Sequence, residues 1–191
     1  MVRLKKVGLK SRSAPHSLAL VGSLVQMRSI PNILSIFYAE FDTIQGPRLV
    51  FQVPENVFKS SDFDSLCEYI IPKMDLCGRY INITVGSFQI CGLPVAIEDP
   101  KYDRNCLLFN LCFVFNADDD TSVFEGVVRK MSRELTSLEL ESEYMSNFSK
   151  KIQLRDIIEQ IYNDLNTYFE SQISVGESNR INLKVIKVLI S

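Results

Sequence analysis

The sequence predicts an α+β domain in which a five-stranded, mainly antiparallel sheet is flanked by helices, in the order β-β-α-β-β-β-α-α. The first observation is a dense apolar run at residues 106–115, which is typical of a strand covered on both faces. The second is a series of short segments rich in β-formers and separated by turns, which favours antiparallel pairing. The third is a pair of later segments with apolar residues at helical spacing. Residues 106–115 are therefore expected to form the middle of the sheet.

A hairpin and a helix are expected to precede this strand. Residues 33–41 and 48–53 are rich in β-formers and flank a turn at residues 42–47, so they predict a β-hairpin. Asp62 is a candidate N-cap for a helix with apolar residues at helical spacing, and this helix must stop before Pro72. Two further strands are expected over residues 80–85 and 88–97.

Two helices are expected after the central strand. Ser122 and Glu125 have the spacing of a capping box at the start of the first helix. The second helix covers roughly residues 150–170. Each helix carries one apolar stripe, and because a surface helix must bury one face, these stripes are interpreted as core. A polar loop is expected over residues 171–180, followed by a new strand at residues 181–190.

The chain is expected to divide into three parts. Residues 1–31 are basic and are interpreted as a disordered extension, with an organelle transit segment and a secretory signal as alternatives. Residues 32–172 form the domain, and residues 173–191 form a linker and the start of a truncated second domain. No apolar run approaches the ~20 residues that a membrane helix needs, so no transmembrane segment is expected.

Charge and cysteine usage exclude several classes of function. The first 39 residues hold six basic residues and no acidic one, whereas the remainder holds 15 basic and 23 acidic residues. With a net charge of −2, the chain is not expected to bind nucleic acid. The five cysteines form no C-x-x-C pair and the single histidine, His16, lies in the basic leader, so free thiols in a reducing compartment and no metal are expected. No glycine-rich phosphate loop occurs, and no cofactor is expected.

The candidate functional side chain is Arg104. The polar turn at residues 99–105 places Arg104 at the beginning of the central strand. Binding and catalytic residues often lie on loops that a rigid strand holds in place. The alternative is that Arg104 is a solvated surface charge with a small energetic role.

The predicted element order matches the longin architecture, and several ordered motifs go further. They are residues 37–41 (FYAEF), 46–47 (GP), 51–54 (FQVP), 91–94 (CGLP), 97–98 (IE), 101–105 (KYDRN), 107–110 (LLFN), 138–142 (LELES), 177–179 (ESN) and 181–186 (INLKVI). With these motifs, residues 32–186 resemble the N-terminal longin domain of the nitrogen permease regulator 2-like family. Three features depart from the family pattern: Asp103 beside Arg104, Thr43 in the hairpin turn, and the end of the chain where the family continues.

The resemblance implies a subunit of a complex that restrains the TOR growth kinase when amino acids are scarce. The partners that it implies are a nitrogen permease regulator 3-like protein, bound through the longin domains, and a DEP-domain subunit. The resemblance also implies that the complex stimulates GTP hydrolysis by Rag GTPases, and that the protein is cytoplasmic and is recruited to the lysosomal or vacuolar surface.

The family's arginine finger corresponds to Arg104, and Lys101, Tyr102 and Asn105 are candidate contacts to the GTPase. A second interpretation is a non-catalytic longin heterodimerisation scaffold, in which Arg104 is incidental. The two differ in whether Arg104 is exposed and unpaired, or tied to Asp103 or another carboxylate.

Overall fold

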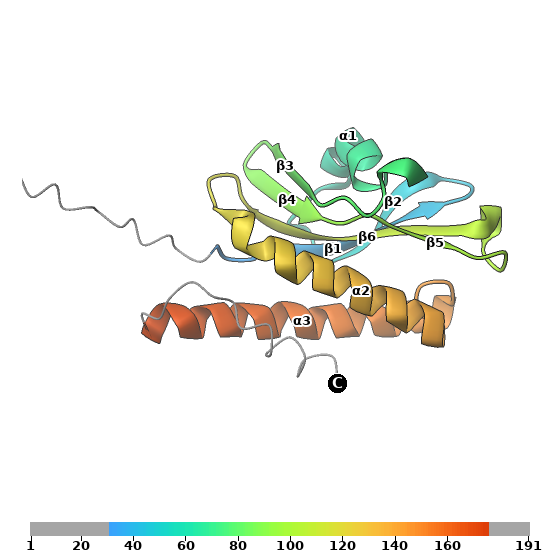
Figure 1. The fold of residues 1–191 in the computed structure, drawn as a ribbon. Helices are drawn as coiled ribbons and strands as arrows, with labels where there is room; N and C mark the ends of the chain where they lie inside the picture. Colours follow the sequence, from blue (N-terminus) through green and yellow to red (C-terminus); the bar gives the residue numbers. More distant parts are fainter. Residues whose placement is uncertain (1–30, 176–191) are drawn as a thin grey trace, which may run out of the picture.

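The computed structural model describes residues 31–175, which form an antiparallel sheet between two layers of helix (Figure 1). The strands are β1 Ser35–Asp42, β2 Gly46–Val53, β3 Ile81–Val85, β4 Phe88–Gly92, β5 Val95–Glu98 and β6 Cys106–Asn116. Their order is β2-β1-β6-β4-β3, with β5 also paired to β6, and every pairing is antiparallel. The predicted α+β class and longin-like architecture are confirmed, with β6 in the middle.

The strand that was predicted over residues 88–97 is broken in two, so the sheet has six strands instead of five. The break falls at Leu93 and Pro94. Pro94 has no N–H to donate to a ladder, and the N–H of Leu93 donates to Oδ1 of Asn110 at 3.0 Å. The Asn110 amide also donates to the Ile70 carbonyl at 2.8 Å. A buried side chain thus replaces the ladder at this point, and β4 and β5 pair with different parts of β6.

The helices cover both faces of the sheet. Helix α1, Ser60–Ile70, lies on one face, and α2, Glu125–Ser142, and α3, Phe148–Val175, lie on the other (Figure 1). Helix α3 continues past residue 170, where the sequence had predicted a loop.

Both predicted helix starts were wrong in detail. Lys59, not Asp62, is the N-cap of α1, and Asp62 lies in the first turn, where a carboxylate is favoured by the helix dipole. The capping box before α2 is absent because a short 3-10 helix, Thr121–Phe124, precedes α2. The side chain of Asp120 caps this turn by accepting from the Ser122 N–H at 3.1 Å.

The core has two parts, one on each face of the sheet, because alternate residues of β1 and β6 point to opposite faces. The part under α1 includes Phe37, Phe58, Phe63, Ile90, Cys112 and Val114. The part under α2 and α3 includes Tyr38, Phe109, Phe113, Phe115, Phe124, Val128, Leu135, Leu154, Ile158 and Leu165. The predicted apolar stripes of both helices are therefore core, and the coverage of β6 on both faces is confirmed.

Several predictions concern residues that the structure does not describe. The leader at residues 1–30 and the strand at residues 181–190 lie outside the described range. Within residues 31–175, no helix is both long enough and apolar enough to span a membrane.

Candidate functional site

The loop between β5 and β6 carries Arg104 and is closed by its own backbone. Tyr102 N–H donates to the Asp99 carbonyl at 3.1 Å, Asn105 N–H donates to the Tyr102 carbonyl at 2.9 Å, and Asp99 N–H donates to the Asn105 carbonyl at 3.1 Å. Arg104 has φ 58° and ψ 20°, and Asn105 has φ 57°. This left-handed conformation costs an L-residue roughly 1–2 kcal/mol. The loop therefore holds Arg104 in a backbone geometry that its own preference does not supply.

The side chain of Arg104 is exposed and lies against an aromatic ring. Its Cζ is 5.1 Å from the centre of the Phe41 ring at the end of β1. A contact of this kind contributes about 0.5–1 kcal/mol at an exposed site. Among residues 31–175, Arg104 forms no ion pair with Asp103 or with another carboxylate. The guanidinium thus packs against Phe41 and belongs to a residue that is exposed as a whole.

A cavity of about 640 Å³ lies beside the loop, and Arg104 is part of its lining. Arg48 also lines it, but Arg48 is held by the buried Glu40 at 2.6 Å. Lys151, on α3, contacts the second oxygen of Glu40 at 2.8 Å. Of the two arginines in this lining, Arg48 is neutralised by a carboxylate and Arg104 is not.

The other residues predicted near Arg104 differ in exposure. Lys101 and Asn105 are exposed, and Lys101 Nζ lies 3.3 Å from a carboxylate oxygen of Glu143. Tyr102 is 8% exposed, and its hydroxyl donates to Oε1 of Glu139 at 2.9 Å. Burial, and then the hydrogen bond to Glu139, raise the pKa of Tyr102 above its ordinary value. The structure thus brings Lys101, Tyr102 and Asn105 into one loop with Arg104, but turns Tyr102 inward.

Sequence reasoning missed two residues of this site. Phe41 supports the guanidinium of Arg104, although the two residues lie far apart in the sequence. Glu139 is fully buried on α2 and binds Tyr102. Glu139 follows Leu135 by four residues and so lies on the apolar stripe of the helix. A carboxylate at such a position was the sequence signal for a buried polar contact.

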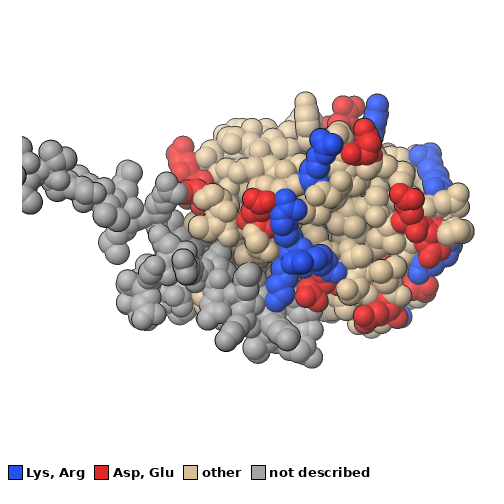
Figure 2. Space-filling model, in the orientation of Figure 1, with Lys and Arg blue, Asp and Glu red and all other residues tan. Residues whose placement is uncertain are grey.

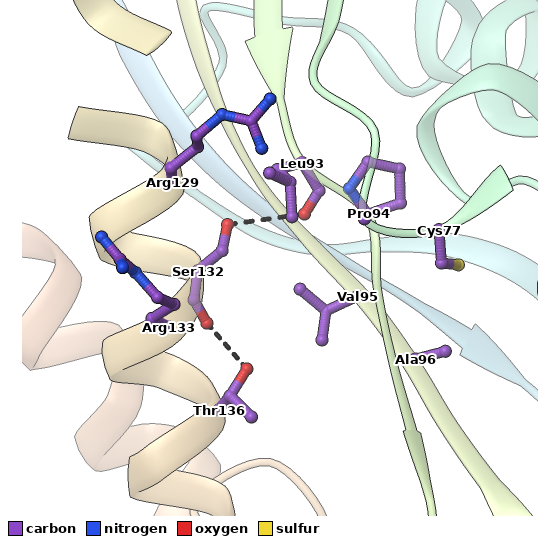
Figure 3. A pocket seen from close by; sticks show the side chains of 10 residues that line it. Cys77, Leu93, Pro94, Val95, Ala96, Arg129, Ser132, Arg133 and Thr136 are labelled. Atoms are coloured by element: carbon purple, nitrogen blue, oxygen red, sulfur yellow. Dashed lines mark hydrogen bonds between the residues drawn. The ribbon is translucent and has the colours of Figure 1, made fainter. Parts of the chain in front are cut away.

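A second hollow, of about 520 Å³, lies between α2 and the β4–β5 junction (Figure 3). Two of its polar side chains are bonded to backbone carbonyls: Ser132 Oγ donates to the Leu93 carbonyl at 3.5 Å, and Thr136 Oγ1 donates to the Ser132 carbonyl at 2.8 Å. Arg129, beside it, is paired with Glu125 at 2.8 Å. None of the predicted site residues lines this hollow.

The surface gives no sign of a strongly basic region on the face drawn in Figure 2. Over the described residues, Lys and Arg on this face lie among Asp and Glu. No group of three or more His, Cys, Asp or Glu residues within 31–175 could hold a metal ion.

Known proteins are similar to this chain mainly over the residues that the structure describes. A family model described as Nitrogen permease regulator 2 matches residues 31–152. A relative named nitrogen permease regulator 2 homolog, from Schizosaccharomyces pombe, is 32% identical over 169 residues, which is 84% of this chain and 41% of that protein. The GATOR complex protein NPRL2 of Drosophila melanogaster is 37% identical over 155 residues, which is 81% of this chain and 37% of that protein. Nitrogen permease regulator 2 of Saccharomyces cerevisiae is 34% identical over 116 residues, which is 60% of this chain and 19% of that protein. The chain spans less than half the length of each of these relatives.

Proposed function

The chain belongs to the nitrogen permease regulator 2 family, and we propose that it supplies the arginine finger of a complex that activates Rag GTPases. One relative carries the GATOR complex in its name, which supports a role as a complex subunit. In this proposal the partners are a nitrogen permease regulator 3-like protein, paired through the longin domains, and a DEP-domain subunit. The complex restrains TOR in amino-acid starvation and is recruited from the cytoplasm to the lysosomal or vacuolar surface.

The observation that carries the proposal is the exposed guanidinium of Arg104, which has no carboxylate partner among the described residues. Hydrolysis of GTP spreads negative charge over the transferring phosphoryl group, and a guanidinium supplied by a second protein stabilises that charge. Its planar fork donates two parallel hydrogen bonds to phosphate oxygens. An arginine already bound to a carboxylate must first break that pair, as Arg48 would have to leave Glu40.

The backbone supports the same role. Because the loop is closed by three backbone hydrogen bonds, and because Phe41 packs against the guanidinium, little conformational freedom is lost when Arg104 enters a GTPase site. A catalytic group that is already ordered before the substrate binds loses less entropy in the transition state, and this lowers the activation barrier of the reaction.

The test is single-turnover GTP hydrolysis by the Rag GTPase, with the reconstituted complex carrying wild-type chain or Arg104→Ala. We expect a loss of at least about a hundredfold, because arginine fingers contribute roughly 10³–10⁵ in rate. Arg133→Ala is the matched control, since Arg133 is exposed on α2 and lines the other hollow. Size-exclusion chromatography of each complex shows whether assembly is intact.

The second candidate is a non-catalytic scaffold that joins its partner through the longin domain. It is favoured by the sheet edges: within the described residues, β2 pairs only with β1, and β3 pairs only with β4. An edge strand presents unpaired backbone groups to a further strand. An unchanged rate of GTP hydrolysis with Arg104→Ala, in an assembled complex, would select this function.

A further inference from the structure

Tyr102 is the anchor of the loop that carries Arg104. Between residues 99 and 105 it is the single residue whose side chain is buried, while Lys101, Asp103, Arg104 and Asn105 are exposed. Its hydroxyl points away from the surface and donates to Oε1 of Glu139 at 2.9 Å. Its carbonyl accepts the Asn105 N–H at 2.9 Å. One residue therefore connects the loop backbone to the interior.

Glu139 is an unusual acceptor because it is fully buried. No ion pair to a basic side chain is formed by its carboxylate among residues 31–175. Its second oxygen accepts the N–H groups of Met145 at 2.6 Å and Ser146 at 3.2 Å, in the connection between α2 and α3. A buried carboxylate is tolerated only when donors satisfy it. The hydroxyl of Tyr102 is thus a required partner of Glu139.

The hydrogen bond between Tyr102 and Glu139 affects Arg104 through the backbone of the loop. Arg104 and Asn105 are both left-handed, and a strained conformation persists only where the surrounding structure determines it. Tyr102 fixes the beginning of this turn through Glu139, and the start of β6 fixes its end. We infer that Tyr102 and Glu139 are positioning residues, which hold Arg104 in its left-handed turn, and that the Tyr102 hydroxyl does not contact the GTPase. This inference rests on the proposed function of Arg104.

A second link between the loop and α2 provides a contrast. Lys101 Nζ lies 3.3 Å from Glu143, but the two side chains are 35% and 54% exposed. Exposed pairs of this kind contribute little, because water screens them and both side chains lose freedom. Lys101 Nζ also lies 4.9 Å from the centre of the Tyr102 ring, a contact that contributes about 0.5–1 kcal/mol at an exposed site. Lys101→Ala is therefore expected to loosen the loop less than loss of the Tyr102 hydroxyl does.

The test is Tyr102→Phe, which removes one hydroxyl and keeps the ring in the core. In the reconstituted complex we expect the maximal single-turnover rate to fall by about tenfold, with the half-saturating concentration of complex unchanged. In an Arg104→Ala background the same substitution is expected to cause no further loss, because its effect passes through Arg104. Tyr69→Phe is the matched control, since Tyr69 is 63% exposed on α1, on the opposite face of the sheet.

Amide hydrogen exchange provides a measurement that does not depend on the GTPase or on assembly. In Tyr102→Phe, the Asn105 amide is expected to exchange about tenfold faster than in wild type, because local opening of the loop becomes easier. Unchanged protection of Asn105 would overturn the inference.

The outcomes separate the inference from the proposed function. A slower rate of GTP hydrolysis with Arg104→Ala, together with a wild-type rate with Tyr102→Phe, would overturn the positioning role alone. The positioning role would also be overturned if Tyr102→Phe slowed hydrolysis further in the Arg104→Ala background. The same holds if Tyr102→Phe raised only the half-saturating concentration of complex and left the maximal rate unchanged. A wild-type rate with Arg104→Ala would overturn both.

Discussion

Gly92, at the end of β4, lies where the sheet leaves no room for a side chain. A Cβ on Gly92 would lie 2.7 Å from Cys112 Sγ and 2.8 Å from Asn110 Oδ1, closer than such atoms approach. Cys112 and Asn110 are fully buried, so neither can move into solvent. We expect Gly92→Ala to displace the Asn110 side chain from its position at the β4–β5 break.

The size of the effect follows from the contacts of Asn110. Its amide accepts the Leu93 N–H at 3.0 Å and donates to the Ile70 carbonyl at 2.8 Å. Overpacking a core costs about 1–3 kcal/mol, and a buried polar group left without its partner costs about 1–3 kcal/mol. We therefore expect Gly92→Ala to lower the free energy of unfolding by about 2–6 kcal/mol, a large part of a typical domain's stability.

The assay is urea unfolding of this chain, followed by circular dichroism. Gly126→Ala is the matched control, because a Cβ at Gly126 in α2 meets nothing within 4 Å. Alanine is the better helix former by about 1 kcal/mol, so the control is expected to be neutral or stabilising. A loss of less than about 1 kcal/mol for Gly92→Ala would refute the close packing of Gly92 against Asn110.

Three further predictions concern other parts of the molecule. Asn105→Val is expected to cost about 1–2 kcal/mol in urea unfolding because of its left-handed φ, while Asn105→Gly retains or raises stability. Cys112, whose thiol pKa burial raises well above its ordinary value, is expected to resist iodoacetamide at pH 8 until the chain is unfolded; rapid native labelling would contradict its burial. Backbone N–H groups of Gln45 and Ile44 lower the pKa of Asp42, so its contribution to stability is present above about pH 4 and is lost as pH falls through the lowered value. The urea midpoint should thus fall less between pH 5 and pH 3 in Asp42→Asn than in wild type, and equal falls would contradict this.

The features that sequence predicted well were those set by local patterns. The apolar run at residues 106–115 correctly predicted a central strand. Both faces of β6 are covered, and a strand that is buried on both faces is apolar along its whole length. The helical stripes predicted the core for the same reason: α2 and α3 each bury one face. The position of Arg104 at the beginning of β6 also followed from the order of turn and strand.

The features that sequence missed depend on residues far apart in the chain. The break between β4 and β5 depends on Asn110, which is 17 residues from Leu93 and 40 from Ile70. Glu139 reaches Tyr102 across 37 residues. Residue spacing within one element cannot predict either contact. Both contacts form only once the strands are in register and α2 is packed on the sheet.

The most direct test of the role of Arg104 is single-turnover GTP hydrolysis by the Rag GTPase with a complex that carries Arg104→Lys. Lysine keeps the positive charge but lacks the planar fork of donors. If Arg104 is the finger, hydrolysis is expected to slow by about a hundredfold or more, close to the value for Arg104→Ala. A rate within about threefold of wild type, in a fully assembled complex, would contradict the assignment.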